Sequence, residues 1–152
     1  MIERVEGIII KDASYSETSK LLTLITKEHG IINLLAKGAK TLKSPLRSTT
    51  TKLTHGYFNI IYKENKLSTL KEVDTIDYYK NIKKDINKIS YATYILELVE
   101  QVIKQTNNEE VFDNLIASLK KNRSKHESIS NNKHTRIKMF RLSWSNANTR
   151  LL

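Results

Sequence analysis

A positively charged segment occupies residues 36–52, with the sequence AKGAKTLKSPLRSTTTK. It carries no acidic side chain and five basic ones: Lys37, Lys40, Lys43, Arg47 and Lys52. Lysine and arginine neutralise phosphates, so this segment, here called the basic loop, is a candidate site for a nucleic-acid backbone. Gly38 and Pro45 interrupt helices and strands, which predicts a flexible, exposed loop. The alternative is a merely solvated face, because binding requires that the cations share one surface.

Three tyrosines are candidate platforms for nucleobases. Tyr57 and Tyr62 lie in the strand expected after the basic loop, and Tyr15 lies in the first expected turn. Many proteins bind single strands by laying the backbone along cations while bases stack on aromatic rings. The alternative role for these tyrosines is ordinary packing of a barrel. No side chain is placed by the sequence to read base edges, so we expect binding that is largely independent of base sequence.

Residue patterns for catalysis or metal binding are largely missing. The four glycines are isolated and form neither a Walker loop nor a dinucleotide fingerprint. The four histidines lack the spacing of metal ligands, and no carboxylates are paired in an apolar context. The absence of cysteine excludes disulfides and cysteine-ligated zinc or iron–sulfur centres. We therefore expect no enzyme, no bound metal and no cofactor.

Five short strands are expected to position the basic loop and the tyrosines. The alternating apolar runs predict them at residues 2–11, 21–27, 31–36, 53–62 and 67–76. Turn residues 28–30 and the polar residues 63–66 form the expected hairpin turns. In the fifth strand, Leu67, Leu70, Val73 and Ile76 are available to face the core. Five strands with one long connection after the third predict a closed barrel of the OB type, with an SH3-like barrel as the alternative.

The hydrophobic period becomes helical after residue 77. Apolar spacing predicts a helix over residues 90–105, capped by Ser90, and another over residues 108–121, capped by Asn108. The chain is thus predicted to be α+β, with an OB-type nucleic-acid-binding domain at residues 1–77 and a helical domain at residues 78–152. Each helix presents one apolar stripe, so we expect the helical half to be less stable than the barrel where that stripe is uncovered.

The overall charge agrees with a polyanionic partner. The chain has 152 residues, a net charge of +10 and an isoelectric point near 9.7. A second basic segment at residues 120–141 holds eight basic residues against one acid, Glu127. The sequence contains no apolar run of the roughly 18 residues that a membrane span requires, and its first residues do not resemble a signal peptide. We therefore expect a cytoplasmic protein that binds neither a membrane nor a small-molecule substrate.

In its motifs and their order, the chain resembles the RecO family of bacterial recombination mediators. The residues that carry the resemblance are VEGIII at 5–10, Tyr15 and Glu17 before SKLLTLIT, AKGAK at 36–40 with Lys43 and Ser44, YATYILEL at 91–98 and VFDNLIASL at 111–119. The resemblance implies an OB-fold followed by a helical domain, binding of single- and double-stranded DNA, and annealing of complementary strands. It also implies loading of recombinase onto DNA coated by single-strand-binding protein, with RecR as a partner and no nucleotide hydrolysis.

The chain departs from the family pattern in two ways. Many members carry a four-cysteine zinc module in the second half, whereas this chain has no cysteine. Beyond residue 140, where the family continues with an apolar helix, this sequence reads RLSWSNANTRLL, and we expect an incomplete helical domain. The residues also bear on two other functions. An RNA-binding OB-fold protein is the alternative, because lysines contact phosphates of either nucleic acid, whereas a nuclease needs clustered acidic metal ligands that the sequence does not offer.

Overall fold

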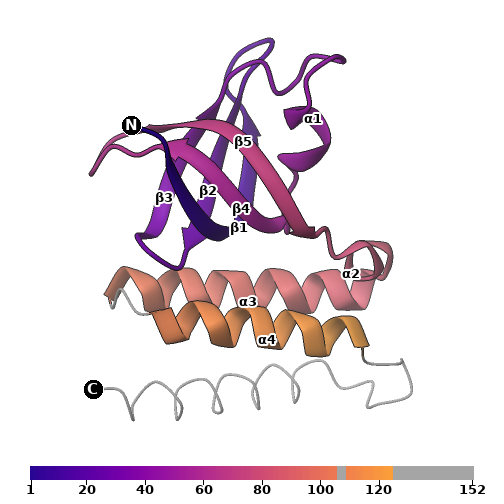
Figure 1. Cartoon of the computed structure of the whole chain (residues 1–152). Coiled ribbons are helices and arrows are strands. Elements are labelled where there is room, and N and C mark those ends of the chain that lie inside the picture. Colours follow the sequence, from indigo (N-terminus) through magenta and orange to yellow (C-terminus); the bar gives the residue numbers. More distant parts are fainter. Residues whose placement is uncertain (106–108, 125–152) are drawn as a thin grey trace.

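The computed structural model describes residues 1–105 and 109–124, and it consists of a β-barrel followed by helices (Figure 1). The strands are β1 (Glu3–Ser14), β2 (Lys20–Thr26), β3 (Gly30–Ala36), β4 (His55–Ile61) and β5 (Ser68–Asp77). The helices are α1 (Leu46–Thr49), α2 (Lys80–Lys84), α3 (Ile86–Gln105) and α4 (Glu109–Ser124). The predicted α+β class is confirmed.

The five strands close into a barrel in the order β1-β2-β3-β5-β4. Neighbouring strands are antiparallel, except that β3 and β5 run parallel and pair only at Leu34 with Ser68 and Leu35 with Thr69. The long connection from β3 to β4 carries α1, whose Leu46 packs into the core inside the barrel. This strand order confirms the predicted OB-type barrel.

The interior of the barrel is filled by alternate residues of its strands. In β3 the buried positions are Gly30, Ile32, Leu34 and Ala36, as expected for a strand with one face inward. Two glycines lie opposite each other on β1 and β4, Gly7 and Gly56. A Cβ atom would lie 2.8 Å from the carbonyl oxygen of Ile25 at Gly7 and 2.5 Å from that of Asp74 at Gly56, so the backbones approach too closely for any side chain.

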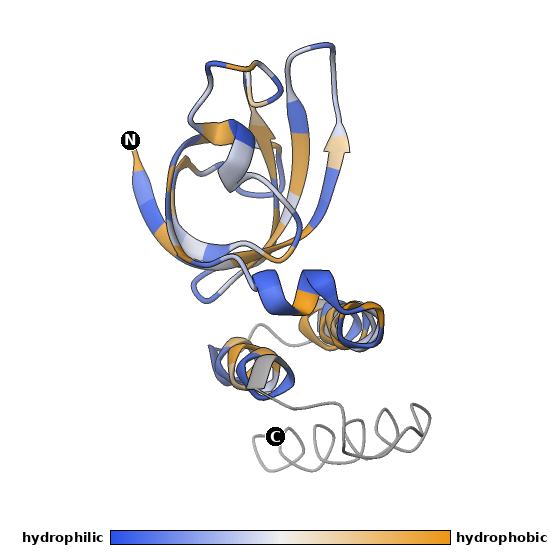
Figure 2. Cartoon of the chain, turned by 90° about the vertical axis from the view of Figure 1, so that its right-hand side faces the viewer, coloured by the Kyte–Doolittle hydropathy of each residue, from blue (hydrophilic) through white to orange (hydrophobic). Residues whose placement is uncertain are grey.

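A second core joins the outside of the barrel to the helices. Ile8 and Ile10 of β1 belong to the same buried cluster as Ile95 of α3 and Phe112 of α4. The middle of β1 is therefore covered on both faces, whereas the sequence predicted a half-buried strand. Figure 2 views α3 and α4 end-on, stacked below the barrel, with α2 leading from the barrel to them. Ion pairs also link the layers, from Lys11 to Glu100 at 3.3 Å and from Lys27 to Asp113 at 3.4 Å.

The start of α3 differs from the prediction. The helix begins at Ile86, and the Asp85 carboxylate accepts hydrogen bonds from the backbone N–H groups of Asn87 (2.9 Å) and Lys88 (3.3 Å). Asp85 is thus the N-cap, and Ser90 lies inside the helix. The sequence also missed α2, while the predicted cap Asn108 falls outside the described residues. Within the described ranges, no helix is both long enough and apolar enough to cross a membrane.

Three expectations about the strands and the basic loop are wrong in detail. β1 continues to Ser14, so the polar residues 12–14 are strand and not turn. Ile76 of β5 does not face the core and is 47% exposed, because irregularities in the β4–β5 pairing change which side chains point inward. Pro45 does not exclude a helix either: it precedes the first residue of α1, where its fixed φ is compatible with helix initiation.

Candidate nucleic-acid interface

Three cations of the basic loop, Lys37, Lys43 and Arg47, are exposed. Among the described residues, no carboxylate forms an ion pair with any of them. Gly38 has a φ of 70°, the left-handed conformation that lets the chain turn directly after β3. These side chains therefore stand in solvent between the end of β3 and α1, where they can contact phosphates.

Lys40 is half-buried, contrary to the expected exposure of the whole loop. Its Nζ donates to Ser14 Oγ at 2.9 Å and to the carbonyl oxygen of Ser16 at 3.2 Å, and its backbone N–H donates to the carbonyl of Thr18 at 2.9 Å. Lys40 therefore fastens the basic loop to the β1–β2 loop. These hydrogen bonds hold the start of the basic loop in place. It is therefore not the flexible segment that its composition predicted.

Lys52, at the other end of the basic loop, lies in a different environment. Its backbone N–H donates to Asp12 Oδ2 at 2.8 Å, while the neighbouring Thr51 Oγ1 accepts a hydrogen bond from Lys83 of α2 at 3.3 Å. Burial lowers the pKa of Lys83, an effect that Asp12 and Asp77 partly oppose. Lys52 is half-buried and its backbone is bound to the carboxylate of Asp12, so it is a weaker candidate for phosphate binding than Lys37 or Lys43.

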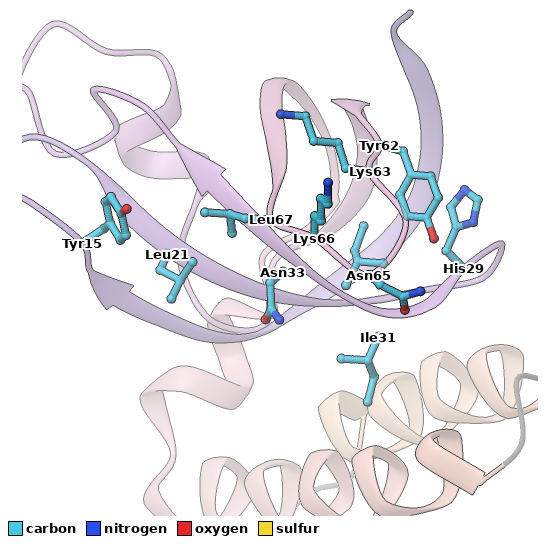
Figure 3. Close-up of a pocket in the computed structure, with 11 residues that line it drawn as sticks. Tyr15, Leu21, His29, Ile31, Asn33, Tyr62, Lys63, Asn65, Lys66 and Leu67 are labelled. Atoms are coloured by element: carbon cyan, nitrogen blue, oxygen red, sulfur yellow. The ribbon is translucent and has the colours of Figure 1, made fainter.

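A groove of about 660 Å³ lies over β2 and β3 (Figure 3). Tyr15, 58% exposed, forms one end, and His29 and Tyr62 form the other. The floor between them includes Leu21, Ile31 and Asn33, and the β4–β5 loop adds Lys63, Asn65, Lys66 and Leu67. Lys40 holds Ser14 and Ser16, the residues on either side of Tyr15, so the groove and the basic loop meet at the β1–β2 loop.

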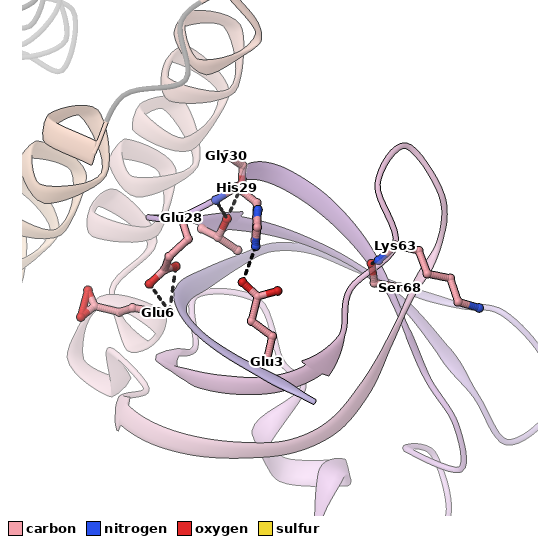
Figure 4. A network of polar contacts seen from close by, with 8 residues as sticks. Glu3, Glu6, Glu28, His29, Gly30, Lys63 and Ser68 are labelled. Carbon is pink, nitrogen blue, oxygen red and sulfur yellow. Dashed lines mark hydrogen bonds and ion pairs between the residues drawn. The ribbon is translucent and has the colours of Figure 1, made fainter. Parts of the chain in front are cut away.

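Hydrogen bonds fix the aromatic end of the groove (Figure 4). The rings of His29 and Tyr62 are stacked, with centroids 3.9 Å apart and planes inclined by 10°. His29 Nε2 lies 2.6 Å from Glu3 Oε1, and the backbone N–H of His29 donates to Thr26 Oγ1 at 2.9 Å. Residues from β1, the β2–β3 turn and the position just after β4 thus build one aromatic platform, here called the His29–Tyr62 platform.

The structure does not bring all the predicted aromatic residues together. Tyr15 and Tyr62 line the groove, whereas Tyr57 lies on β4 between Glu6 of β1 and Asp74 of β5. The guanidinium carbon of Arg4 lies 4.6 Å from the centre of the Tyr57 ring, and Arg4 also pairs with Asp74 at 2.6 Å. Tyr57 is therefore part of a separate, partly acidic face.

Sequence reasoning missed several groove residues, notably His29, Lys63 and Lys66. Residues 28–30 and 63–66 were identified as turns, but nothing in a single sequence shows that the two turns flank the same groove. The available signal was the OB topology itself, in which the β2–β3 face and the loops β1–β2 and β4–β5 commonly form the ligand site. In the described ranges, no three His, Asp or Glu side chains gather as potential metal ligands.

The comparisons with known proteins agree with this fold. The family model described as "Recombination protein O N terminal" matches residues 1–79, and "Recombination protein O C terminal" matches residues 83–143. The chain belongs to the RecO family. The barrel therefore corresponds to the N-terminal part of that family, and α3 and α4 fall within the match to the C-terminal part.

Individual relatives bear the same family name. The chain is 38% identical over 120 residues to the DNA repair protein RecO of Bacillus cytotoxicus, covering 78% of this chain and 48% of the relative. The DNA repair protein RecO of Listeria monocytogenes serotype 4b is 38% identical over 104 residues, covering 68% of this chain and 40% of the relative. The chain thus spans less than half the length of these RecO relatives.

Proposed function

We propose that this chain is the DNA-binding part of a non-catalytic recombination mediator. It binds single- and double-stranded DNA, anneals complementary strands and helps to load recombinase during DNA repair. RecR and single-strand-binding protein are the proposed protein partners, on the strength of membership in the RecO family. The observation that carries the DNA-binding proposal is that Lys37, Lys43 and Arg47 of the basic loop are exposed and form no ion pair within the described residues, on an OB-type barrel.

The charge arrangement favours contact with the backbone of DNA. Exposed lysines without carboxylate partners break no ion pair when they bind a phosphate. Each phosphate that they neutralise releases counterions from the DNA. Contacts of this kind do not depend on base sequence or on pairing, so they apply to single strands and duplexes alike. This property suits annealing, in which the same surface must hold a strand before and after it pairs.

The proposal predicts the salt dependence of binding. In the double variant Lys37→Ala/Lys43→Ala, the slope of log K against log salt should become shallower by about 1.4 on single strands and about 1.8 on duplex, because two phosphate contacts are lost. Affinity should fall on every sequence. Fluorescence anisotropy at several salt concentrations measures both quantities, and the melting temperature should stay unchanged because both side chains are exposed.

A matched control is Lys71→Ala/Lys80→Ala, which removes two exposed lysines away from the basic loop. Equal losses in the two double variants would show that only net charge matters and would refute the assignment. Annealing of complementary labelled strands should slow in the first variant and not in the control. Competition with RNA of the same sequence tests the alternative: tighter binding of RNA would favour an RNA-binding protein.

A further inference from the structure

The basic loop presents one large apolar side chain to solvent among its cations. Leu42 is 82% exposed, and its neighbour Lys43 is exposed as well. Within the described residues, no carboxylate forms an ion pair with Lys43. Leu42 also lies outside the groove that ends at the His29–Tyr62 platform. The loop that is proposed to hold phosphates therefore carries a leucine that contributes little to the packing of the barrel.

A hydrogen-bonded turn fixes the position of this leucine. The backbone N–H of Ser44 donates to the carbonyl oxygen of Thr41 at 3.2 Å, which places Leu42 and Lys43 at the two central positions of the turn. Thr41 Oγ1 in turn donates to the carbonyl oxygen of Gly38 at 2.8 Å. Local hydrogen bonds thus present an apolar side chain and a cation next to each other at the tip of the basic loop.

Both sides of this turn are attached to the barrel. On one side, the hydrogen bonds from Lys40 to Ser14 and Ser16 hold the loop. On the other side, the backbone N–H of Leu46 donates to Ser44 Oγ at 3.1 Å, and the Leu46 side chain packs in the barrel core. A side chain presented on a turn that is already ordered loses little conformational entropy when it enters a ligand.

We propose that Leu42 is a wedge that inserts between neighbouring base pairs of duplex DNA and unstacks them. Leucine is among the apolar side chains that DNA-binding proteins insert at base steps. Insertion transfers the apolar surface of Leu42 from water to the faces of the bases, while Lys37, Lys43 and Arg47 hold the flanking phosphates. Unstacking costs less where a mismatch already weakens the duplex, so the wedge favours imperfect duplex. This inference rests on the proposed function, which supplies the DNA.

The fluorescence of 2-aminopurine tests the wedge, because this base analogue brightens when it is unstacked. In short duplexes that carry the analogue at one position after another, saturating original protein should raise the fluorescence, and Leu42→Ala should abolish the rise. Leu42→Met keeps an apolar side chain of similar volume and should retain it. The slope of log K against log salt should be the same for Leu42→Ala and the original protein, because no phosphate contact is lost.

A mismatched duplex provides the second measurement. The original protein should bind a duplex with a central mismatch about tenfold more tightly than the matched duplex, whereas Leu42→Ala should bind the two alike. Ile86→Ala is the matched control, because Ile86 is 78% exposed at the first residue of α3, in the layer beneath the barrel (Figure 1). This variant should behave like the original protein in both measurements.

Several outcomes would overturn the wedge. One is an equal rise of fluorescence in the original protein and Leu42→Ala, and another is the absence of any rise with the original protein at saturation. If Leu42→Ala instead loses binding to vesicles of anionic phospholipid while the fluorescence rise is unchanged, the leucine serves a membrane surface. Melting temperatures should agree among the variants, because Leu42 is exposed, and Leu42→Met separates loss of the wedge from loss of the fold.

The two proposals fail in distinguishable ways. If Lys37→Ala/Lys43→Ala changes the salt slope but Leu42→Ala leaves the fluorescence rise unchanged, DNA binding stands and the wedge is wrong. If the affinity and salt slope of Lys37→Ala/Lys43→Ala match those of the original protein, the proposed phosphate surface is wrong. Anisotropy measured on the same duplexes shows that each protein is at saturation, so a missing fluorescence rise is not mistaken for missing binding.

Discussion

At the residue scale, His55 is a buried polar group that the binding site does not use. It lies at the start of β4, where its ring approaches that of Phe112 of α4 with centroids 6.0 Å apart. Neither ring nitrogen has a hydrogen-bond partner within the described part of the chain, and Nε2 lies 3.7 Å from Glu6 Oε2. Burial lowers the pKa of His55 below its ordinary value of 6.5, and the nearby Glu6 opposes this only in part.

This histidine should make stability depend on pH. Just below pH 6.5, unfolded chains protonate this histidine while the folded protein does not, so acid favours unfolding. The contribution of uncharged His55 to the free energy of unfolding is fully present above pH 6.5. It is lost as the pH falls from there toward the pKa of His55 in the folded protein. His55→Leu removes the titrating group and should flatten this part of the stability profile, measured by urea unfolding between about pH 7.5 and pH 5.

His29, which pairs with Glu3, is present in both the original protein and His55→Leu. The difference between their stability profiles therefore reports on His55 alone. Asp77 and Lys120 also influence His55, the former favouring and the latter opposing its charged form, and neither is altered. Parallel stability profiles for the original protein and His55→Leu would show that the buried imidazole does not titrate in this range.

At the scale of elements, the sequence pattern predicted where the strands lie better than it predicted what each strand packs against. Alternation and turn residues predicted five strands, because both are local properties of the chain. The same pattern could not show that Ile8 and Ile10 are covered by helices nearly a hundred residues away. It also could not separate Tyr57 from Tyr62, since the face that a strand residue presents depends on pairing register and on bulges.

At the candidate site, too, the sequence predicted the local features and missed those that depend on long-range contacts. The basic loop was visible because its five cations lie within one short segment of the sequence, whereas the groove is assembled from Tyr15, His29 and Tyr62 only when the barrel closes. The fastening role of Lys40 was equally invisible, because Ser14 and Ser16 become its partners through the β1–β2 turn.

The N-cap of α3 gives a direct test at this scale. Asp85→Ala should lower the free energy of unfolding by about 1 kcal/mol, because two backbone N–H groups lose their acceptor. Ser90→Ala, which the sequence had pointed to, should change stability by less than about 0.5 kcal/mol, since Ser90 lies within the helix. Chemical unfolding of both variants measures the difference, and a larger loss for Ser90→Ala would restore the predicted cap.

At the scale of the whole molecule, the barrel and the helices share a hydrophobic core. Ile8, Ile10, Ile25 and Leu53 of the first half pack in one cluster with α3 and α4. The proposed division at residue 77 therefore separates two parts that bury each other's surface. The helical stripe that the sequence left uncovered is covered in part by the barrel, which changes our expectation for the relative stability of the two halves.

We predict that the two parts lose structure together. Phe112→Ala, at the centre of the shared core, should cost about 3–5 kcal/mol and lower hydrogen-exchange protection in β1 as well as in α3 and α4. Phe58→Ala, inside the barrel, is the matched comparison. Loss of protection confined to the helices in Phe112→Ala would show that the barrel is independent and that the lower helical stability first predicted is correct.

The close approach at Gly56 has a consequence for genetics. Any other residue there meets the backbone of β5, and backbone cannot move aside as a flexible side chain can. A Gly56→Ala allele would weaken the barrel while leaving every lysine and ring of the proposed surface chemically intact. Cells carrying it should lose the protein's function only as the temperature rises, whereas in cells with Lys37→Ala/Lys43→Ala the protein should bind DNA more weakly at every temperature. Comparing the two alleles would separate the phenotype of a missing protein from that of a folded protein that binds DNA too weakly.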